Sequence, residues 1–160
     1  MMEIKFRAKD ADDGVWRYGF YIFHMKTLLC FATEKEVEEN EEHLIVFDGC
    51  CDWNLPMPWY KSNINPETLG QFINIKDINK KDAYVGDIVI DDLDRKWVIY
   101  NAPGGFRICN VVEYVSTNGK PIIENGLSEP QCAAWFKQNC RIIGNIHDNP
   151  ELLGEHNEKE

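Results

Sequence analysis

Apolar and polar residues alternate along much of the chain, which is the pattern of strands with one buried face. From Ile4 onward the alternation places Ile4, Phe6 and Ala8 on one face of a strand. The segment VWRYGFYI at 15–22 is predicted to be its partner strand. Between them, the polar DADDG at 10–14 predicts the turn of an N-terminal β-hairpin.

Short apolar segments bounded by turn residues predict further strands. Turn chemistry such as Asn118-Gly119, within VSTNGKPII, joins them. The predicted strands cover 27–32, 44–47, 69–75, 84–91, 95–101, 105–115 and 140–147. Many short strands with little helix indicate a barrel or a strongly curved sheet.

Helical signals are few. The clearest helix is predicted at 129–138, with Ser128 as its N-cap. A helix of a single turn is predicted at 148–153, with Pro150 in its first turn. The Glu-rich stretch at 34–42 has short helical potential.

The segment YVGDIVIDD at 84–92 is the most informative local element. Gly86 can adopt a positive φ that other residues resist, and the Asp87 side chain can accept hydrogen bonds from amides of a turn. The apolar residues that follow then alternate along a strand. We therefore interpret Asp87 as structural. The acidic residues further along are predicted to form a solvated hairpin tip: Asp91, Asp92 and Asp94.

Residues 50–60 (CCDWNLPMPWY) interrupt the alternation. Pro56 and Pro58 exclude this segment from a central strand, so we predict a loop. The loop is too apolar to lie fully in water, and we expect it to dock on its own barrel or on another subunit. This candidate interaction loop presents Trp53, Leu55, Met57, Trp59 and Tyr60.

With 160 residues and 18.6 kDa, the chain can build a core without metals or disulfides. We predict one domain over 1–153 and an acidic tail over 154–160. The opening MMEIKFRAKD is charged from its third residue, so no signal peptide is expected, and no apolar run is long enough to span a membrane. We expect a cytoplasmic protein whose six cysteines are reduced.

The formal net charge of -10 disfavours nucleic-acid binding, because phosphate neutralisation needs an excess of Lys and Arg. Much of this charge is local, however. Residues 34–42 hold six Glu and one Lys, and residues 151–160 hold four Glu and one Lys. Each run is predicted to be solvated; an acidic mimic of nucleic acid is the alternative.

Common catalytic signatures are missing from the sequence: it has no phosphate-binding loop, GxSxG, HExxH or paired CxxC. Cys50 and Cys51 lie near His43 and Asp52, which is a conceivable thiolate metal site. Because no second Cys pair accompanies them, we interpret these thiols as lining the base of the loop. We predict no catalytic residue, no cofactor and no metal.

Three separated segments resemble the YopX family of phage- and prophage-encoded proteins: IKFRAKDADDGVWRYG at 4–19, NPETLGQFINIKDINKKDAYVGDIV at 65–89 and IIGNIHDNPELL at 142–153. The resemblance implies a small, mainly β domain built around an SH3-like barrel, with extra hairpins and one or two short helices, and with no established activity. The positions that recur in the family fall on Gly70, Gln71, Asp77, Tyr84, Gly86, Asp87, Gly144, Asn145 and Pro150.

The chain departs from the family pattern at three places. Asn74 stands where the family usually has Gly, and Asn is the residue other than Gly that best tolerates a left-handed backbone, so the turn is expected to survive. Lys80 also replaces a usual Gly, and Val85 replaces an acidic residue. Any function that rests on that acid is therefore in doubt.

We expect a non-enzymatic accessory protein of a phage or prophage that acts through protein contacts, as a homo-oligomer with an unknown protein partner. The alternative is a nucleic-acid-binding accessory protein that uses an SH3-like barrel. A third class is an enzyme that uses the carboxylates near Asp87 or the thiols of Cys50 and Cys51.

Overall fold

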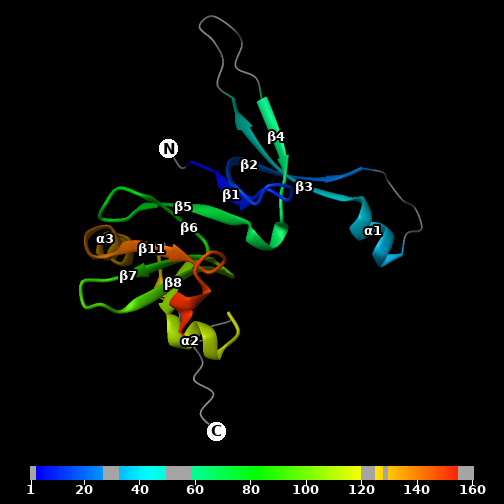
Figure 1. The fold of residues 1–160 in the computed structure, drawn as a ribbon. Coiled ribbons are helices and arrows are strands. Elements are labelled where there is room, and N and C mark those ends of the chain that lie inside the picture. Colours follow the sequence, from blue (N-terminus) through cyan, green and yellow to red (C-terminus); the bar gives the residue numbers. More distant parts are fainter. Residues whose placement is uncertain (1–2, 27–32, 50–58, 120–124, 128–129, 155–160) are drawn as a thin grey trace, which may run out of the picture. The chain divides into compact units, whose positions relative to one another are not determined.

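The computed structural model describes residues 3–26, 33–49, 59–119, 125–127 and 130–154 (Figure 1). The chain divides into two compact units, residues 3–71 and 72–160. The boundary falls inside strand β5 (Gly70–Lys76), not in a linker. The single domain over 1–153 and the acidic tail over 154–160 remain predictions. The described residues of 1–153 belong to both units.

The first unit is an antiparallel sheet with strand order β4-β3-β2-β1, to which the first two residues of β5 are added. A helix lies between β2 and β3, and a 3₁₀ helix precedes β5. The elements are β1 (Phe6–Lys9), β2 (Trp16–Met25), α1 (Glu34–Asn40), β3 (Glu41–Asp48), β4 (Trp59–Asn63) and η1 (Pro66–Thr68).

The predicted N-terminal hairpin is confirmed, since β1 and β2 pair around the turn at 10–14. Ala8 is fully buried, with Ile45 and Ile64, in a small core against which Phe6 packs. Ile4, predicted on the same face, is instead exposed. It precedes the first paired residue of β1, so no neighbouring strand covers it.

The second unit contains the rest of β5, which pairs with β6, and an antiparallel sheet of five strands in the order β10-β9-β8-β7-β11. Two α-helices and a 3₁₀ helix accompany these strands. The elements are β6 (Asp82–Tyr84), β7 (Asp87–Ile90), β8 (Lys96–Ala102), β9 (Gly105–Asn110), α2 (Val111–Ser116), β10 (Asn125–Gly126), α3 (Pro130–Asn139), β11 (Arg141–Asn145) and η2 (Pro150–Leu153).

Both faces of the five-stranded sheet are covered, as Figure 1 shows for α2 and α3. Val89 and Ile99 face a core that includes Phe136 of α3. Ile88 and Val98 face a second core, formed with Val111 of α2 and side chains of η2. Burial on both faces explains why Ile88, Val89 and Ile90 of β7 are apolar in succession.

The prediction of a mainly β chain is confirmed, with two antiparallel sheets and a few short helices. The predicted barrel is not closed: within the described residues both strand orders are linear, and their end strands do not pair. The same residues form three α-helices and two 3₁₀ helices, where one or two short helices were expected.

One predicted strand is partly wrong. The run at 105–115 is a strand only as far as Asn110, and α2 begins at the next residue. Asn110 caps that helix, because its side-chain oxygen accepts a hydrogen bond from the amide of Val112 at 2.9 Å. The predicted strand at 27–32 lies outside the described residues.

In the described part of the chain, every helix is too short or too polar to cross a membrane.

Candidate interaction surface

Asp77 builds the turn between β5 and β6. Its Oδ1 accepts the amide hydrogens of Asn79 and Lys81, each at 2.9 Å. Its Oδ2 accepts the amide hydrogen of Ile142 in β11, at 3.0 Å. Lys80 completes the turn with a left-handed φ of 64°. Both carboxylate oxygens are thus occupied by backbone donors, which makes Asp77 a structural residue.

Asp91 repeats this design between β7 and β8. Its Oδ1 accepts the amide hydrogens of Leu93 and Arg95, and its Oδ2 accepts Arg95 Nε at 2.8 Å and Trp97 Nε1 at 3.0 Å. Burial by itself would raise the pKa of Asp91, but these hydrogen bonds together lower it below its ordinary value. The predicted solvated tip therefore has a buried carboxylate at its base.

Gly86 and Asp87 form the turn predicted at 84–92. Gly86 has a φ of 88°, and its amide donates to the carbonyl of Ile99 at 2.8 Å. Asp87 Oδ2 accepts the amide hydrogen of Tyr84 at 2.8 Å, and the Asp87 side chain is buried. These contacts agree with a structural role for Asp87.

The corner after β11 depends on close packing. Asn145 Oδ1 accepts the amide hydrogens of His147 and Asp148, both at 2.9 Å. A Cβ atom at Gly144 would lie 2.4 Å from Asn149 Oδ1, so a larger residue does not fit there without a shift. Pro150 then starts η2, a 3₁₀ turn at the place where a single-turn helix was predicted.

The first unit contains a polar cluster around Asp10, in a cavity of about 690 Å³. Asp10 Oδ2 accepts the Ser62 hydroxyl and Arg17 Nε, and Oδ1 accepts the amide of Asp12. The Ser62 hydrogen bond lowers the pKa of Asp10 well below its ordinary value, and the Asp12 amide lowers it further. Both oxygens of the Asp10 carboxylate are thus occupied by donors of its own turn and of neighbouring side chains.

Two cysteines of the second unit are unreactive by their surroundings. Cys109 and Cys140 are buried, and burial raises the pKa of each thiol to about 12. Cys50, Cys51 and Asp52 lie outside the described residues. Among the residues that are described, no group of three His, Cys, Asp or Glu side chains could hold a metal ion.

An exposed apolar face lies on the first sheet. Tyr18, Phe20 and Ile22 alternate along β2 and therefore point to one side. Their side chains are 51%, 65% and 44% exposed. Trp59 of β4, 80% exposed, lies opposite Asp48 of β3.

Strand register places these side chains on one surface. Phe20 pairs with Val46 of β3, and Val46 in turn pairs with Lys61 of β4. Directly paired residues of antiparallel strands point to the same face, so Phe20, Val46 and Lys61 share one side of the sheet. Asp48 and Trp59 lie two residues from Val46 and Lys61 along their strands and therefore point to that side as well. We name the surface formed by Tyr18, Phe20, Ile22 and Trp59 the aromatic face. An antiparallel sheet ordinarily presents polar residues to solvent, so this face is unusual.

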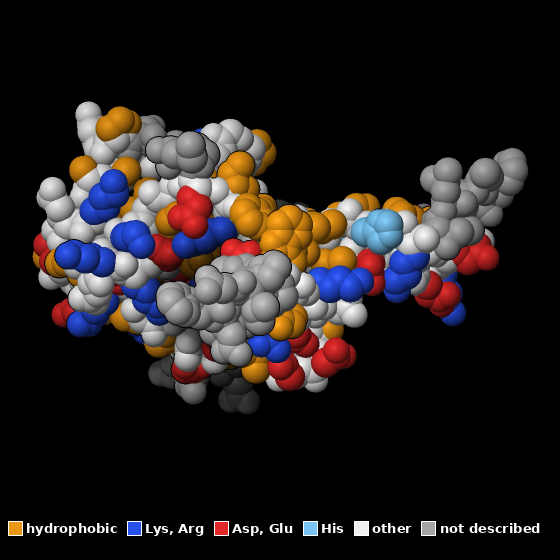
Figure 2. All heavy atoms as spheres, turned by 90° about the horizontal axis from the view of Figure 1, so that it is seen from above, with side chains coloured by type: hydrophobic (Ala, Val, Ile, Leu, Met, Phe, Trp, Pro, Cys, Tyr) orange, Lys and Arg blue, Asp and Glu red, His pale blue; other side chains and the backbone are white. Residues whose placement is uncertain are grey.

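Basic side chains border the aromatic face on β1. Arg7 pairs with Tyr18 and Lys9 pairs with Trp16, which puts both cations on the same side of the sheet. Arg7 Cζ lies 4.8 Å from the centre of the Trp16 ring, and Lys9 Nζ lies 5.7 Å from it. Figure 2 shows one view of the molecule, in which hydrophobic, basic and acidic side chains are all exposed.

The candidate interaction loop is described only in part. Trp53, Leu55 and Met57 lie outside the described residues. Trp59 and Tyr60 belong to β4 and not to a loop, because Pro58 precedes the first residue of the strand and does not interrupt it. The sequence did not indicate that Trp59 shares a surface with side chains of β2, since that depends on the pairing of β3 with both strands.

A family model described as YopX protein matches residues 5–154. The chain belongs to the YopX family. Comparison with curated proteins finds no match. Among solved structures, the chain is similar to protein EF1440 from Enterococcus faecalis, with 19% identity over 96% of this chain and 99% of that chain and a TM-score of 0.45.

The YopX positions named from the sequence mostly lie at turns and strand ends. Gly70 and Gln71 start β5 and pair with β1. Tyr84 ends β6 and packs on the ring of Phe72, with ring centres 5.5 Å apart. Asn74 has a φ of 59°, so it takes the left-handed conformation expected for a replacement of Gly.

Proposed function

We propose that this YopX protein is an accessory protein of a phage or prophage, that it is cytoplasmic and non-enzymatic, and that it acts through protein–protein contacts as a homo-oligomer. The aromatic face is the observation that supports the proposal. Four large apolar side chains share this surface, and exposed patches of this kind are typical of interaction sites. The hydrogen bonding of Asp77, Asp91 and Asp10 adds support, because turn amides and neighbouring side chains already occupy these carboxylates.

A second copy of the chain is the partner that we favour for this face. Strand register puts Lys61 and Asp48 on the same side of β3 and β4, beside Phe20 and Trp59. A surface that carries an apolar centre and both signs of charge can pair with itself across a two-fold axis. The exposed large apolar side chains described in the second unit, Ile78, Leu93 and Val112, lie outside its strands.

Light scattering coupled to size-exclusion chromatography tests the proposal. We expect the wild type to elute as a dimer or larger species, and Phe20→Ser/Trp59→Ser to shift toward the monomer. Leu93→Ser/Val112→Ser is the matched control, because Leu93 and Val112 are also exposed but lie in the second unit. It should keep the mass of the wild type. A monomeric wild type at every concentration, or a face variant with unchanged mass, would contradict the proposal.

Binding of single-stranded nucleic acid is a second candidate for the same face. Lys9 borders Trp16, and aromatic rings beside cations are the usual platform for stacked bases. Arg7 lies over the same ring but is buried. Because the strand orders of both sheets are linear, we place nucleic-acid binding on this surface and not on an SH3-like barrel. Fluorescence anisotropy with a labelled oligothymidine at low salt tests it. Binding that weakens in Lys9→Gln/Lys61→Gln supports this candidate, and no binding at low salt removes it.

A further inference from the structure

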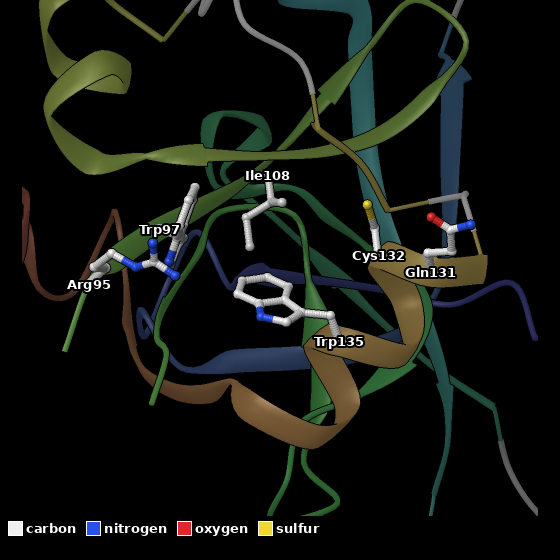
Figure 3. A pocket seen from close by; sticks show the side chains of 6 residues that line it. All are labelled: Arg95, Trp97, Ile108, Gln131, Cys132 and Trp135. Atoms are coloured by element: carbon white, nitrogen blue, oxygen red, sulfur yellow. The ribbon is translucent and has the colours of Figure 1, made fainter. Parts of the chain in front are cut away.

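A second surface feature lies between α3 and the five-stranded sheet of the second unit. It is a cavity of about 340 Å³, which is within the size range of small-molecule sites. Figure 3 shows its lining side chains, which come from β8 and β9, from the turn before β8 and from α3: Arg95, Trp97, Ile108, Gln131, Cys132 and Trp135. We propose that this cavity is a binding site for a small aromatic anion.

The walls of the cavity are apolar and aromatic. Trp97 and Trp135 meet edge to face, with ring centres 5.8 Å apart and an angle of 78° between the rings. Ile108 adds a buried aliphatic surface. Flat aromatic molecules gain most from such walls, because rings pack on one another in stacked or edge-to-face arrangements.

The Trp97 wall is fixed before any ligand arrives. Its indole Nε1 donates to Asp91 Oδ2 at 3.0 Å, and Arg95 Cζ lies 5.5 Å from its ring centre. Asp91 is itself held by the amides of its turn. A site whose walls are already ordered loses less conformational entropy on binding.

Polar groups lie at the two ends of the cavity, as Figure 3 shows: Arg95 at one end, and Gln131 and Cys132 at the other. The Arg95 side chain is 49% exposed, whereas its ion-pair partner Asp91 is 0% exposed. The ion pair uses Nε, so the terminal nitrogens of the guanidinium remain as donors. A ligand at this rim meets the cation and not the carboxylate.

These features select the class of ligand. The aromatic walls favour a flat ring system, and the guanidinium at the rim favours a carboxylate, sulfonate or phosphate group on it. Gln131 can add one neutral hydrogen bond at the far end. The volume suits a single small molecule and is too small for a folded segment of another protein.

Fluorescence titration with 8-anilinonaphthalene-1-sulfonate, an aromatic anion, tests the site. We expect saturable binding of one molecule per chain at this site. Arg95→Gln should weaken it by about tenfold or more, as expected for the loss of a charged hydrogen bond, and Arg95→Lys should weaken it less. The uncharged N-phenyl-1-naphthylamine should bind wild type and Arg95→Gln equally. Phe20→Ser/Trp59→Ser separates this site from the aromatic face and should leave the binding unchanged.

Two further measurements test the site without relying on the correct folding of the Arg95 variants. Cys132→Phe places a ring in the cavity and should abolish binding of both probes while circular dichroism stays unchanged. In the wild type, a saturating concentration of 8-anilinonaphthalene-1-sulfonate should slow the alkylation of Cys132 by N-ethylmaleimide. Mass spectrometry of the labelled peptide measures the rate. Binding that survives Cys132→Phe, or alkylation of Cys132 at an unchanged rate, would overturn the proposal.

Discussion

Several carboxylates of this protein hold turns of the backbone in place by accepting hydrogen bonds from amides. Asp77 and Asp91 each accept amide hydrogens from the residues two and four positions ahead. In each turn the residue three positions after the Asp, Lys80 or Asp94, has a left-handed φ. Asp10 binds amides of its own turn in the first unit. The same side-chain chemistry thus closes turns in both units.

Asp91 makes stability depend on pH. Because the pKa of Asp91 is lowered in the folded state, its contribution is complete above its ordinary value of 3.8 and is lost as pH falls through the folded value. We expect Asp91→Asn to lower the free energy of unfolding by about 3 kcal/mol at neutral pH and by much less in acid. Urea titrations at both pH values measure this. Asp92→Asn, at an exposed neighbour, should change little.

Lys80 is strained, with a φ of 64°. A residue with a Cβ atom costs about 1–2 kcal/mol in this conformation, and Gly does not. Lys80→Gly should therefore raise the free energy of unfolding by about 0.5–1 kcal/mol, after the greater chain entropy of Gly is subtracted. Thermal unfolding checks the result, with Lys81→Gly as the control that should destabilise. A Lys80→Gly variant less stable than wild type would contradict the prediction.

At the scale of elements, the sequence predicts where strands lie better than it predicts where they end and which of their faces is buried. Turn residues located the hairpins, because the need for a positive φ or a side-chain acceptor is local. The end of β9 was missed because Asn110 acts as a helix cap within an apolar run. The aromatic face could not be found from β2 alone. From Phe20 to Phe23 the strand is apolar on both sides, so a period of two does not tell which side is buried.

Gly144 tests the corner between β11 and η2. The methyl group of Gly144→Ala would lie 2.4 Å from Asn149 Oδ1 and 2.8 Å from Leu152 Cδ1. We expect a loss of about 2 kcal/mol in the free energy of unfolding, by the usual cost of overpacking. Adding Asn149→Ala should recover part of the loss, since it removes the nearest atom. Chemical denaturation of the single and double variants measures both effects, and a double variant as unstable as the sum of its parts would argue against this contact.

The whole molecule has separate cores in its two units. Ala8, Ile45 and Ile64 form the core of the first, whereas the second has a core on each side of its five-stranded sheet. No change of composition marks the boundary between the units, because it falls within strand β5 and not in a linker.

Separate cores predict separate responses to cavity-forming substitutions. Ile45→Ala should cost about 3 kcal/mol and lower amide protection in β2 and β3, while leaving β7, β8 and β9 protected. Ile99→Ala, in the core of the second unit, should expose β7 to β9. Hydrogen exchange followed by mass spectrometry measures both. A uniform loss of protection in either variant would show one cooperative unit.

The passage of the chain between its units has a mechanical consequence. Residues 3–71 and 72–160 meet within β5, where Gly70 and Gln71 pair with Arg7 and Phe6. Tension applied between the two ends must therefore travel along this strand. Phe6 and Gln71, where the load enters and leaves this pairing, lie opposite each other in antiparallel strands, so the few bonds between β1 and β5 would open one pair after another.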